Sequence, residues 1–432
     1  MREKIVQIRR DQNPLGHFIR IGSTGHIQLE EALAGDRVQI ERAVFDASVV
    51  KSQAHLRDAL RGAGAELILD TNVAELASVG RYDGVVRNCA WAAGDRPLQG
   101  SDFDGSAGKE RMLKIAQCAL EHNFRTVLAP THLLSGAEDP NFALDLRICR
   151  ELRSALDASG GAAVSIDYPL LISATTLREP RGRAALIAAL KSLPFDNLWL
   201  RIAGFGASAT PIAVRRYIEA LQDFQGLERP LVGDNVAGLN GLAALAFGAL
   251  GGIVHGIGIG ETFNNGTWKR RPTKRDQKGG AGTRILLPFL DRHLKPAQLK
   301  DVMDANGGRR LAACHDATCC RRGYDDMIAD PRGHYLRTRR SQMLALSQVS
   351  EFMRPNHFLR EDLTKAERTS AMMGRLKLSD PKVKEIIGEE TDRLHRLHVM
   401  LEVLQEQGID QRRALVPAPR ASRTIRSSRI SR

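Results

Sequence analysis

The feature that most constrains this chain is a repeated alternation of short apolar runs and longer helical stretches between residues 36 and 290. The runs are RVQIERAVFD, AELILDTN, RTVLAPTH, AAVSIDYPL, NLWLRIAGFG, RPLVGDNVAG, GGIVHGIGIG and TRILLPFL. Between them, stretches such as 142–158 and 211–225 carry apolar residues at helical spacing. Eight strand and helix units in about 250 residues predict a closed (β/α)8 barrel, because alternating elements favour right-handed crossovers and a parallel sheet. An open doubly wound sheet is the alternative.

Composition divides the rest of the chain. We predict an N-terminal segment over 1–35, the barrel over 36–295, a cysteine- and histidine-bearing segment over 296–340, a helical C-terminal region over 341–415 and a disordered Arg/Ser tail over 416–432. No charged-then-apolar leader is visible, and no apolar run reaches the roughly 20 residues of a membrane span. We therefore expect a cytoplasmic protein without a membrane partner.

The charge balance points to a polyanionic partner. The chain has 63 Lys and Arg against 50 Asp and Glu, a net charge of +13. One basic cluster directly follows the GGIVHGIGIG run, at the rim of the predicted barrel, and its candidate nucleic-acid contacts are Trp268, Lys269, Arg270, Arg271, Lys274 and Arg275. Trp268 could stack on an exposed base or anchor its loop. An ordinary solvated surface is the alternative for the cluster.

Polar residues close most of the apolar runs. Chemistry in a (β/α)8 barrel takes place at the C-terminal ends of the strands. The residues at these ends are Asp70, Thr71, Asn72, Thr131, His132, Asp167, Tyr168, Arg201, Asp234, Asn235 and His255. Any one of them could be a helix cap or a turn residue. As a set, the carboxylates, imidazoles and arginine predict an acid-base site at one mouth.

A group of cysteines follows the last run. Cys314, Cys319, Cys320 and His334 supply the four sulfur and nitrogen ligands of a tetrahedral zinc site. Adjacent cysteines strain the backbone when both bind one ion, so Cys319 or Cys320 could be a bystander, with His315 or Asp316 completing the set. Unused buried cysteines, or a disulfide between Cys319 and Cys320, are the alternatives.

The order of segments over roughly residues 60–340 resembles the tRNA-guanine transglycosylase superfamily. ELILDTNVAELAS is similar to the family's strand that ends in an active-site aspartate, which would be Asp70. LWLRIAGFGA is similar to the glycine-rich strand that binds the base through its backbone, which implies a role for Gly204 and Gly206. The family also carries a structural zinc, held by three cysteines and a histidine, after its barrel. The resemblance implies a glycosyltransferase that exchanges guanine for a 7-deazaguanine base in tRNA or DNA.

The resemblance also sets expectations for individual residues. The family's nucleophilic aspartate has no counterpart in GIVHGIG, so Asp234 is our candidate nucleophile and Asp70 the acid or base. His255 is a third candidate catalytic residue. Asp167 or His255 would read the base edge, with Asn72 and Arg201 also binding substrate. The family often forms dimers, and the helical C-terminal region could serve such pairing or nucleic-acid binding.

Two other function classes remain open on the sequence. One is a non-catalytic nucleic-acid-binding barrel. The other is a barrel enzyme for a small phosphorylated metabolite, with its phosphate site in the glycine-rich segments.

Overall fold

Eight parallel strands form a closed barrel in the computed structural model, which describes residues 14–258, 260–271, 273, 282–407 and 413–420. The strand order is β1-β2-β3-β4-β5-β6-β8-β9. The strands are β1 (Gly16–Ile21), β2 (Arg42–Asp46), β3 (Glu66–Asp70), β4 (Thr126–Leu128), β5 (Ser165–Ser173), β6 (Leu198–Ala203), β8 (Leu231–Asp234) and β9 (Gly252–Gly256). The predicted (β/α)8 barrel is confirmed.

One strand of the barrel differs from the prediction. TRILLPFL is not the eighth strand, because β11 (Ile285–Leu287) forms an antiparallel hairpin with β12 (Arg292–Leu294) outside the barrel. The barrel is instead closed by β1, which pairs with both β2 and β9 and lies in the predicted N-terminal segment. This strand was not predicted from its sequence, GHFIRI, because His17 and Arg20 interrupt the apolar run that a buried parallel strand usually shows.

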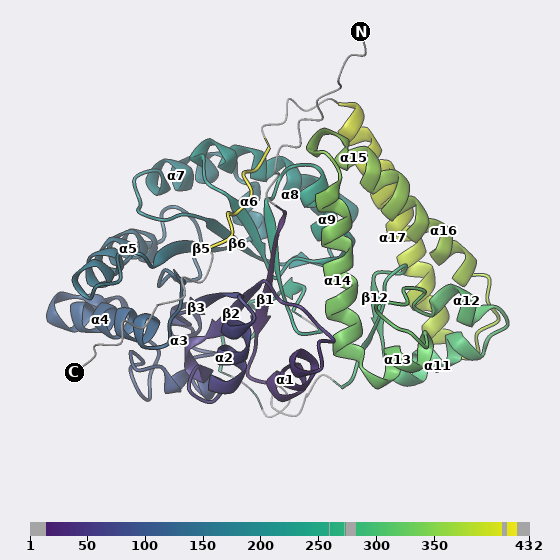
Figure 1. Ribbon diagram of the computed structural model, residues 1–432. Coiled ribbons are helices and arrows are strands. Elements are labelled where there is room, and N and C mark those ends of the chain that lie inside the picture. Colours follow the sequence, from purple (N-terminus) through teal and green to yellow (C-terminus); the bar gives the residue numbers. More distant parts are fainter. Residues whose placement is uncertain (1–13, 259, 272, 274–281, 408–412, 421–432) are drawn as a thin grey trace, which may run out of the picture.

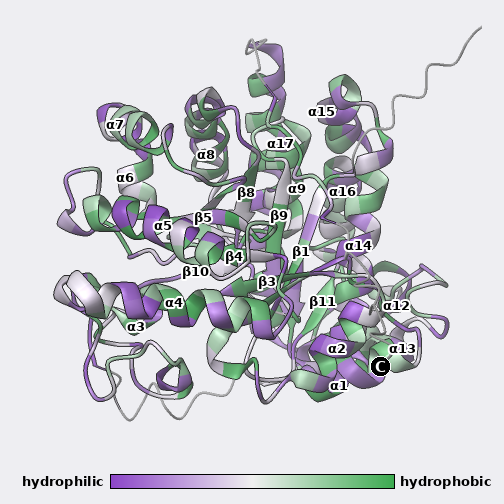
Figure 2. Cartoon of the chain, turned by 60° about the vertical axis from the view of Figure 1, so that its left-hand side comes forward, coloured by the Kyte–Doolittle hydropathy of each residue, from purple (hydrophilic) through white to green (hydrophobic). Residues whose placement is uncertain are grey.

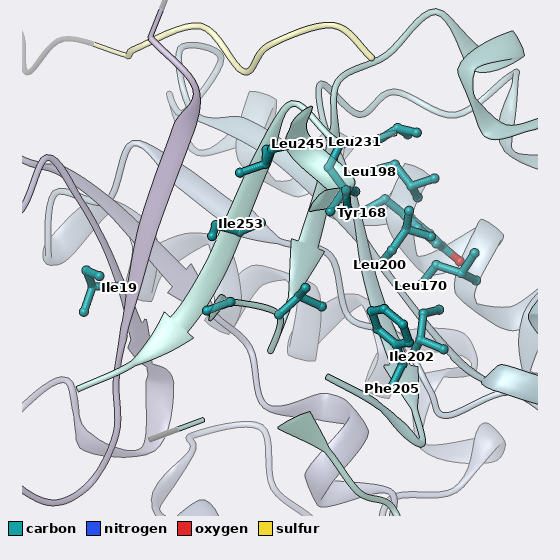
Figure 3. Packing of buried hydrophobic residues seen from close by; sticks show 14 of the residues in the cluster. Ile19, Tyr168, Leu170, Leu198, Leu200, Ile202, Phe205, Leu231, Leu245 and Ile253 are labelled. Carbon is teal, nitrogen blue, oxygen red and sulfur yellow. The ribbon is translucent and has the colours of Figure 1, made fainter. Parts of the chain in front are cut away.

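Helices surround the barrel (Figure 1). They are α1 (His26–Ala34), α2 (Ala54–Gly62), α3 (Val73–Leu76), α4 (Gly105–Glu121), α5 (Pro140–Ala158), α6 (Ala174–Arg178), α7 (Pro180–Leu190), α8 (Pro211–Phe224) and α9 (Gly238–Ala246). Proline in the first turn starts both α5 and α8, and the side chains of Asp139 and Thr210 cap them. The hydrophobic residues between strands and helices form the main core, part of which is shown in Figure 3.

The barrel interior is built in three layers. The middle layer is apolar and contains Phe18, Val44, Ile68, Leu128, Trp199, Val232 and Val254. Because strand side chains alternate with period two, the residues two positions away also point inward. Towards the C-terminal ends these are Arg20, Asp46, Asp70, Arg201 and Asp234, and towards the N-terminal ends they include Arg42, Glu66, Thr126 and Asn197. Asp167 of β5 joins the N-terminal set through its hydrogen bonds with Asn197 and Trp199. The apolar layer therefore separates two polar layers.

A helical C-terminal region packs beside the barrel, as predicted (Figures 1 and 2). Its helices are α11 (Pro296–Asp304), α12 (Gly308–Ala312), α13 (Tyr324–Ala329), α14 (Pro331–Gln348), α15 (Arg354–His357), the π-helix Phe358–Leu363, α16 (Thr364–Met373) and α17 (Pro381–Glu406). A second hydrophobic core joins the hairpin to α11, α12 and α17. Within the described part of the chain, none of the helices has the length and apolarity of a membrane span.

The segment 413–420 returns to the barrel and lies across its N-terminal end. Arg42 Nη2 donates to the Pro417 carbonyl at 2.9 Å. Arg420 pairs with Asp167 at 2.9 Å and with Glu66 at 3.5 Å. The predicted disorder from residue 416 is therefore wrong for 416–420, because Arg420 neutralises buried carboxylates. Residues 421–432 lie outside the described residues.

Candidate functional site

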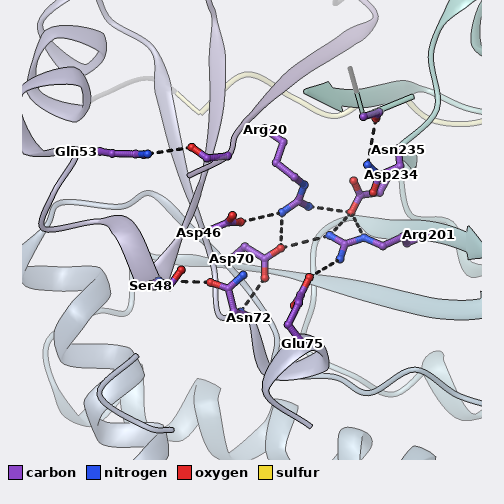
Figure 4. A network of polar contacts seen from close by, with 12 residues as sticks. Arg20, Asp46, Ser48, Gln53, Asp70, Asn72, Glu75, Arg201, Asp234 and Asn235 are labelled. Atoms are coloured by element: carbon purple, nitrogen blue, oxygen red, sulfur yellow. Dashed lines mark hydrogen bonds and ion pairs between the residues drawn. The ribbon is translucent and has the colours of Figure 1, made fainter. Parts of the chain in front are cut away.

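The C-terminal layer of the barrel forms a network of four carboxylates and two guanidinium groups (Figure 4). Arg20 contacts Asp70 at 2.5 Å, Asp234 at 2.9 Å and Asp46 at 3.5 Å. Arg201 contacts Asp234 at 2.6 Å and Asp70 at 3.3 Å. Arg201 Nη1 lies 3.4 Å from Glu75 Oε1, and Glu75 is on α3, just after β3. The structure thus brings the predicted Asp70, Arg201 and Asp234 together.

Asp70 and Glu75 differ in proton affinity although both are buried. Burial raises the pKa of Asp70, but the charges of Arg20 and Arg201 and the Asn72 N–H bond outweigh it, so the pKa lies below its ordinary value. Burial, and then the charge of Asp70, raise the pKa of Glu75 to about 7. The site thus places an ionised carboxylate beside a carboxyl group that can exchange a proton near neutral pH.

The two carboxyl oxygens of Asp234 have unequal surroundings. Its Oδ2 accepts from Arg20 Nη2 at 2.9 Å and from Arg201 Nε at 2.7 Å. Its Oδ1 is buried and has no hydrogen-bond partner among the described residues. Asp70 has no such vacancy, because its Oδ1 accepts the Asn72 N–H at 2.9 Å and its Oδ2 faces the guanidinium groups. A buried oxygen without a partner is a place where a ligand can bind or react.

Asn72 lies at the mouth, as predicted, but it serves the backbone. It has a left-handed conformation with φ of 53° at the start of α3. Its side-chain oxygen accepts the Ser48 N–H at 3.4 Å. The contacts of Asn72 thus hold the turn that carries Glu75 toward Arg201.

Asp167 does not lie at the mouth. β5 continues to Ser173, so Asp167 is near the start of its strand, beneath the apolar layer. It accepts bonds from Asn197 Nδ2 at 3.0 Å, Trp199 Nε1 at 2.9 Å and Arg420 at 2.9 Å. The expectation that this carboxylate reads a base at the C-terminal mouth is therefore wrong, because a charged residue inside the strand was interpreted as its end.

His255 points out of the barrel, since its neighbour Val254 points in. Its Nε2 lies 2.8 Å from His17 Nε2, and its ring meets Tyr335 of α14 edge to face. Its Nδ1 donates to the Gly256 carbonyl at 2.9 Å, so Nε2 of the neutral ring accepts a hydrogen bond from the His17 Nε2–H group. Burial lowers the pKa of His255 to about 4. The predicted catalytic role is not supported, because the ring is held away from the mouth.

The glycine-rich strand end is already paired. Gly204, with φ of 83°, donates its N–H to Phe263. Gly206 pairs with Thr262 in a small sheet of β7 (Phe205–Gly206) and β10 (Thr262–Phe263), and its carbonyl accepts from Asn240 at 2.8 Å. The segment that was expected to present its backbone to a base is therefore hydrogen-bonded to β10 instead.

The basic segment begins at a buried tryptophan, Trp268. Trp268 is buried and packs edge to face on Phe263, whose ring faces the Arg201 guanidinium at 5.9 Å. This contact ties the segment to the mouth, and Lys269, Arg270 and Arg271 that follow are exposed. Lys274 and Arg275 lie outside the described residues. Of the two roles considered for Trp268, loop anchoring fits its burial.

The cysteine cluster has the geometry of a tetrahedral metal site. The donor atoms of Cys314, Cys319, Cys320 and His334 lie within 4.8 Å of one another. Cys319 Sγ and Cys320 Sγ are 3.7 Å apart, and each lies 3.3 Å from His334 Nδ1. A tetrahedron with bonds of roughly 2.3 Å has edges of roughly 3.8 Å. The four residues could therefore hold a metal ion.

The surroundings of the cluster favour all four predicted ligands. Both adjacent cysteines can face one point because their N–H groups donate to the Asp316 carbonyl in a tight turn. His315 is exposed and contacts the Arg310 carbonyl, and neither it nor Asp316 is needed to complete the set. His334 Nε2 lies 3.0 Å from the Leu286 carbonyl, which orients the ring, as hydrogen-bond partners of metal-binding histidines do.

Sequence reasoning missed three residues of the mouth: Arg20, Asp46 and Glu75. Arg20 was missed with its strand. Asp46 ends the run RVQIERAVFD just as Asp70 ends the next one, and this parallel could have identified it. Glu75 lies on a helical turn beyond the strand, and the sequence carries no signal that it turns back toward Arg201.

A scan of family models and a search of the curated proteins give no match. Similar solved structures include a type I 3-dehydroquinate dehydratase from Clostridium difficile, with 9% identity over 59% of this chain and 89% of that chain and a TM-score of 0.37. An endo-β-1,4-mannanase from Cellulomonas fimi has 10% identity over 62% and 71%, with a TM-score of 0.39. A D-psicose 3-epimerase has 13% identity over 56% and 84%, with a TM-score of 0.33. At such TM-scores the matches carry no argument about substrate or reaction.

Proposed function

We propose that this chain is an enzyme that exchanges a guanine base in a nucleic acid through a carboxylate nucleophile at the barrel mouth. The observation that carries the proposal is the Asp234 Oδ1 atom, which has no hydrogen-bond partner among the described residues. Two guanidinium groups contact the other oxygen of Asp234, and one of them also contacts Glu75, whose pKa is raised to about 7. Asp234 is the nucleophile, as expected from the sequence, but Glu75 replaces Asp70 as the acid and base. Asp70 instead orients Arg20 and Arg201.

The two carboxyl groups divide the reaction between them. Asp234 Oδ1 attacks the sugar C1′ while the bond from C1′ to guanine breaks, and protonated Glu75 gives its proton to the leaving base. The incoming base then gives a proton to Glu75, and its nitrogen displaces Asp234 from C1′. Asp234 and Glu75 thereby return to their starting states.

A nucleic-acid partner is supported by the exposed basic residues of the segment anchored by Trp268. Lys269, Arg270 and Arg271 follow this anchor, so their charges lie beside the mouth. A base must leave its stack to reach a barrel mouth, and basic side chains would hold the flanking phosphates. The net charge of +13 agrees with such a partner.

We also propose that the cysteine cluster binds zinc and that its role is structural. Four protein ligands leave no open position for substrate. The site joins the start of α14 to the cysteine turn, inside the second core. Metal analysis should find about one zinc ion per chain, and Cys314→Ser should remove it. Full occupancy of the variant would contradict this assignment.

The test of the main proposal is base incorporation. The protein is incubated with labelled guanine or 7-deazaguanine bases and with bulk tRNA or DNA. We expect label in one nucleic acid and a covalent adduct that Asp234→Asn cannot form. Asp304→Asn, an exposed site on α11, is the matched control and should keep full activity. Absence of incorporation with every combination would overturn the proposal.

A further inference from the structure

A second polar centre lies next to the mouth and takes no part in the proposed reaction. His132 follows β4 and is 4% exposed. Its Nδ1 lies 2.5 Å from Asp145 Oδ1, and its backbone N–H donates to Asp145 Oδ2 at 2.9 Å. Asp145 is on α5 and is fully buried. One carboxylate thus fixes both the main chain and the ring of His132.

This arrangement decides which nitrogen of His132 can bind a ligand. Because Nδ1 faces the Asp145 carboxylate and donates its proton to it, Nε2 is the ring nitrogen that remains to contact a ligand. Nε2 is buried and has no partner among the described residues. A satisfied core histidine would have a donor at this position, so the unused acceptor calls for a ligand.

His132 lines a cavity of about 410 Å³. The volume lies in the range of small-molecule sites, roughly 300–1,000 Å³. The wall also contains Ser135, Asp139, Ser173, Thr176, Trp268 and Lys269. Residues 74, 77 and 78, on and just after α3, line it too, so the cavity adjoins the helix that carries Glu75.

We infer that this cavity binds one nucleoside monophosphate unit. His132 Nε2 accepts a hydrogen bond from an N–H or O–H of the unit, Trp268 supplies an apolar wall and Lys269 meets the phosphate. The inference rests on the proposed function in one respect, since the unit would be a neighbour of the reacting nucleotide in the bound strand. A free mononucleotide offers the same chemistry.

Calorimetric titration tests the inference without requiring base exchange. The ligands are guanosine and adenosine monophosphates and short single-stranded RNA and DNA. We expect His132→Phe to raise Kd about tenfold, the effect of losing one hydrogen bond to a buried group. His395→Phe, which changes an exposed histidine on α17, is the control and should bind as the wild type does.

Four outcomes separate the sources and the two proposals. Mononucleotide binding that His132→Phe weakens supports a free nucleotide as a ligand, whereas weakening confined to the strands supports the neighbouring unit. An unchanged Kd in His132→Phe, or no wild-type binding to any ligand, overturns the inference even if base exchange is observed. Weakened binding together with no incorporation of any base supports the cavity and overturns the proposed function.

The tautomer of His132 gives a second readout that needs no variant at this position. In nitrogen-15 spectra we expect His132 with its proton on Nδ1, and we expect the Nε2 resonance to move when a nucleotide binds. Asp145→Asn would donate to Nδ1, transfer the ring proton to Nε2 and weaken nucleotide binding. An Nε2 resonance that no ligand moves would overturn the inference.

Discussion

The two ends of the barrel interior contain similar residues in different electrostatic states. At the N-terminal end, two guanidinium groups, of Arg42 and Arg420, face two carboxylates, of Glu66 and Asp167. At the C-terminal end, Arg20 and Arg201 face the four carboxyl groups of Asp46, Asp70, Glu75 and Asp234. The first set is balanced in charge, and the second has two acidic groups in excess.

The carboxylates at the two ends also differ in how completely their oxygens are hydrogen-bonded. All four oxygens of Glu66 and Asp167 have partners within 3.5 Å, among them Thr126, Asn197 and Trp199. Asp234 at the other end keeps one oxygen without a partner among the described residues. A buried carboxylate in this barrel is therefore structural where its hydrogen-bond partners are complete and available for chemistry where they are not.

The largest expected effect comes from the unpartnered oxygen. Asp234→Asn should lower base exchange by about a thousandfold or more, because an amide cannot form the covalent adduct. Initial rates of label incorporation measure this loss. If Asp167→Asn lost as much activity while still folded, the distinction between the two ends would be wrong.

Glu75→Gln should have the next largest effect, about a hundredfold, the usual size of an acid-base contribution. The protonated form of Glu75 donates, and its pKa is raised to about 7, so wild-type exchange should fall as pH increases above about 7. The amide cannot ionise, so the variant should lose this limb of the pH profile. Glu389→Gln, at an exposed site on α17, should keep it. Persistence of the limb in Glu75→Gln would assign it to another group.

Asp167→Asn should act on stability rather than on chemistry. It leaves Arg420 opposite a neutral group and disturbs the bonds from Asn197 and Trp199, at a cost of about 3 kcal/mol in free energy of unfolding. Urea titration followed by circular dichroism measures the change. A variant as stable as the wild type would show that the N-terminal layer does not depend on this carboxylate.

Arg420→Ala should have the smallest effect, about 1–2 kcal/mol, because water can reach the exposed part of its site. The side chain of Arg420 is 18% exposed, and Arg42 continues to face Glu66. The same urea titration measures the loss, and base exchange should be unchanged. A selective loss of exchange in a stable variant would connect the two layers, against our interpretation.

Much of the fold could be predicted from the sequence because buried parallel strands read as apolar runs. Seven of the eight runs correspond to barrel strands, and Asp70, Arg201 and Asp234 were placed at the mouth correctly. The remaining barrel strand, β1, was not predicted because GHFIRI carries the charged Arg20, which points into the barrel. A charged residue inside a strand thus breaks the apolar run by which such strands are predicted.

The remaining errors concern direction rather than element type. Asp167 was given the wrong end of the barrel because nothing in SIDYPLLIS marks where the apolar layer crosses the strand. The outward direction of His255 could have been predicted from alternation, since Val254 beside it fits the interior. The position of Glu75 could not have been predicted, because its approach to Arg201 depends on the turn at Asn72.

The position of Arg420 has a consequence for how the protein is made. It lies 253 residues after Asp167 and 354 after Glu66 in the chain. A ribosome exposes both carboxylates long before it exposes this guanidinium, and only Arg42 accompanies them. A barrel that forms during synthesis therefore contains an uncompensated buried charge at its N-terminal end. Its final stability is reached only after translation has passed residue 420.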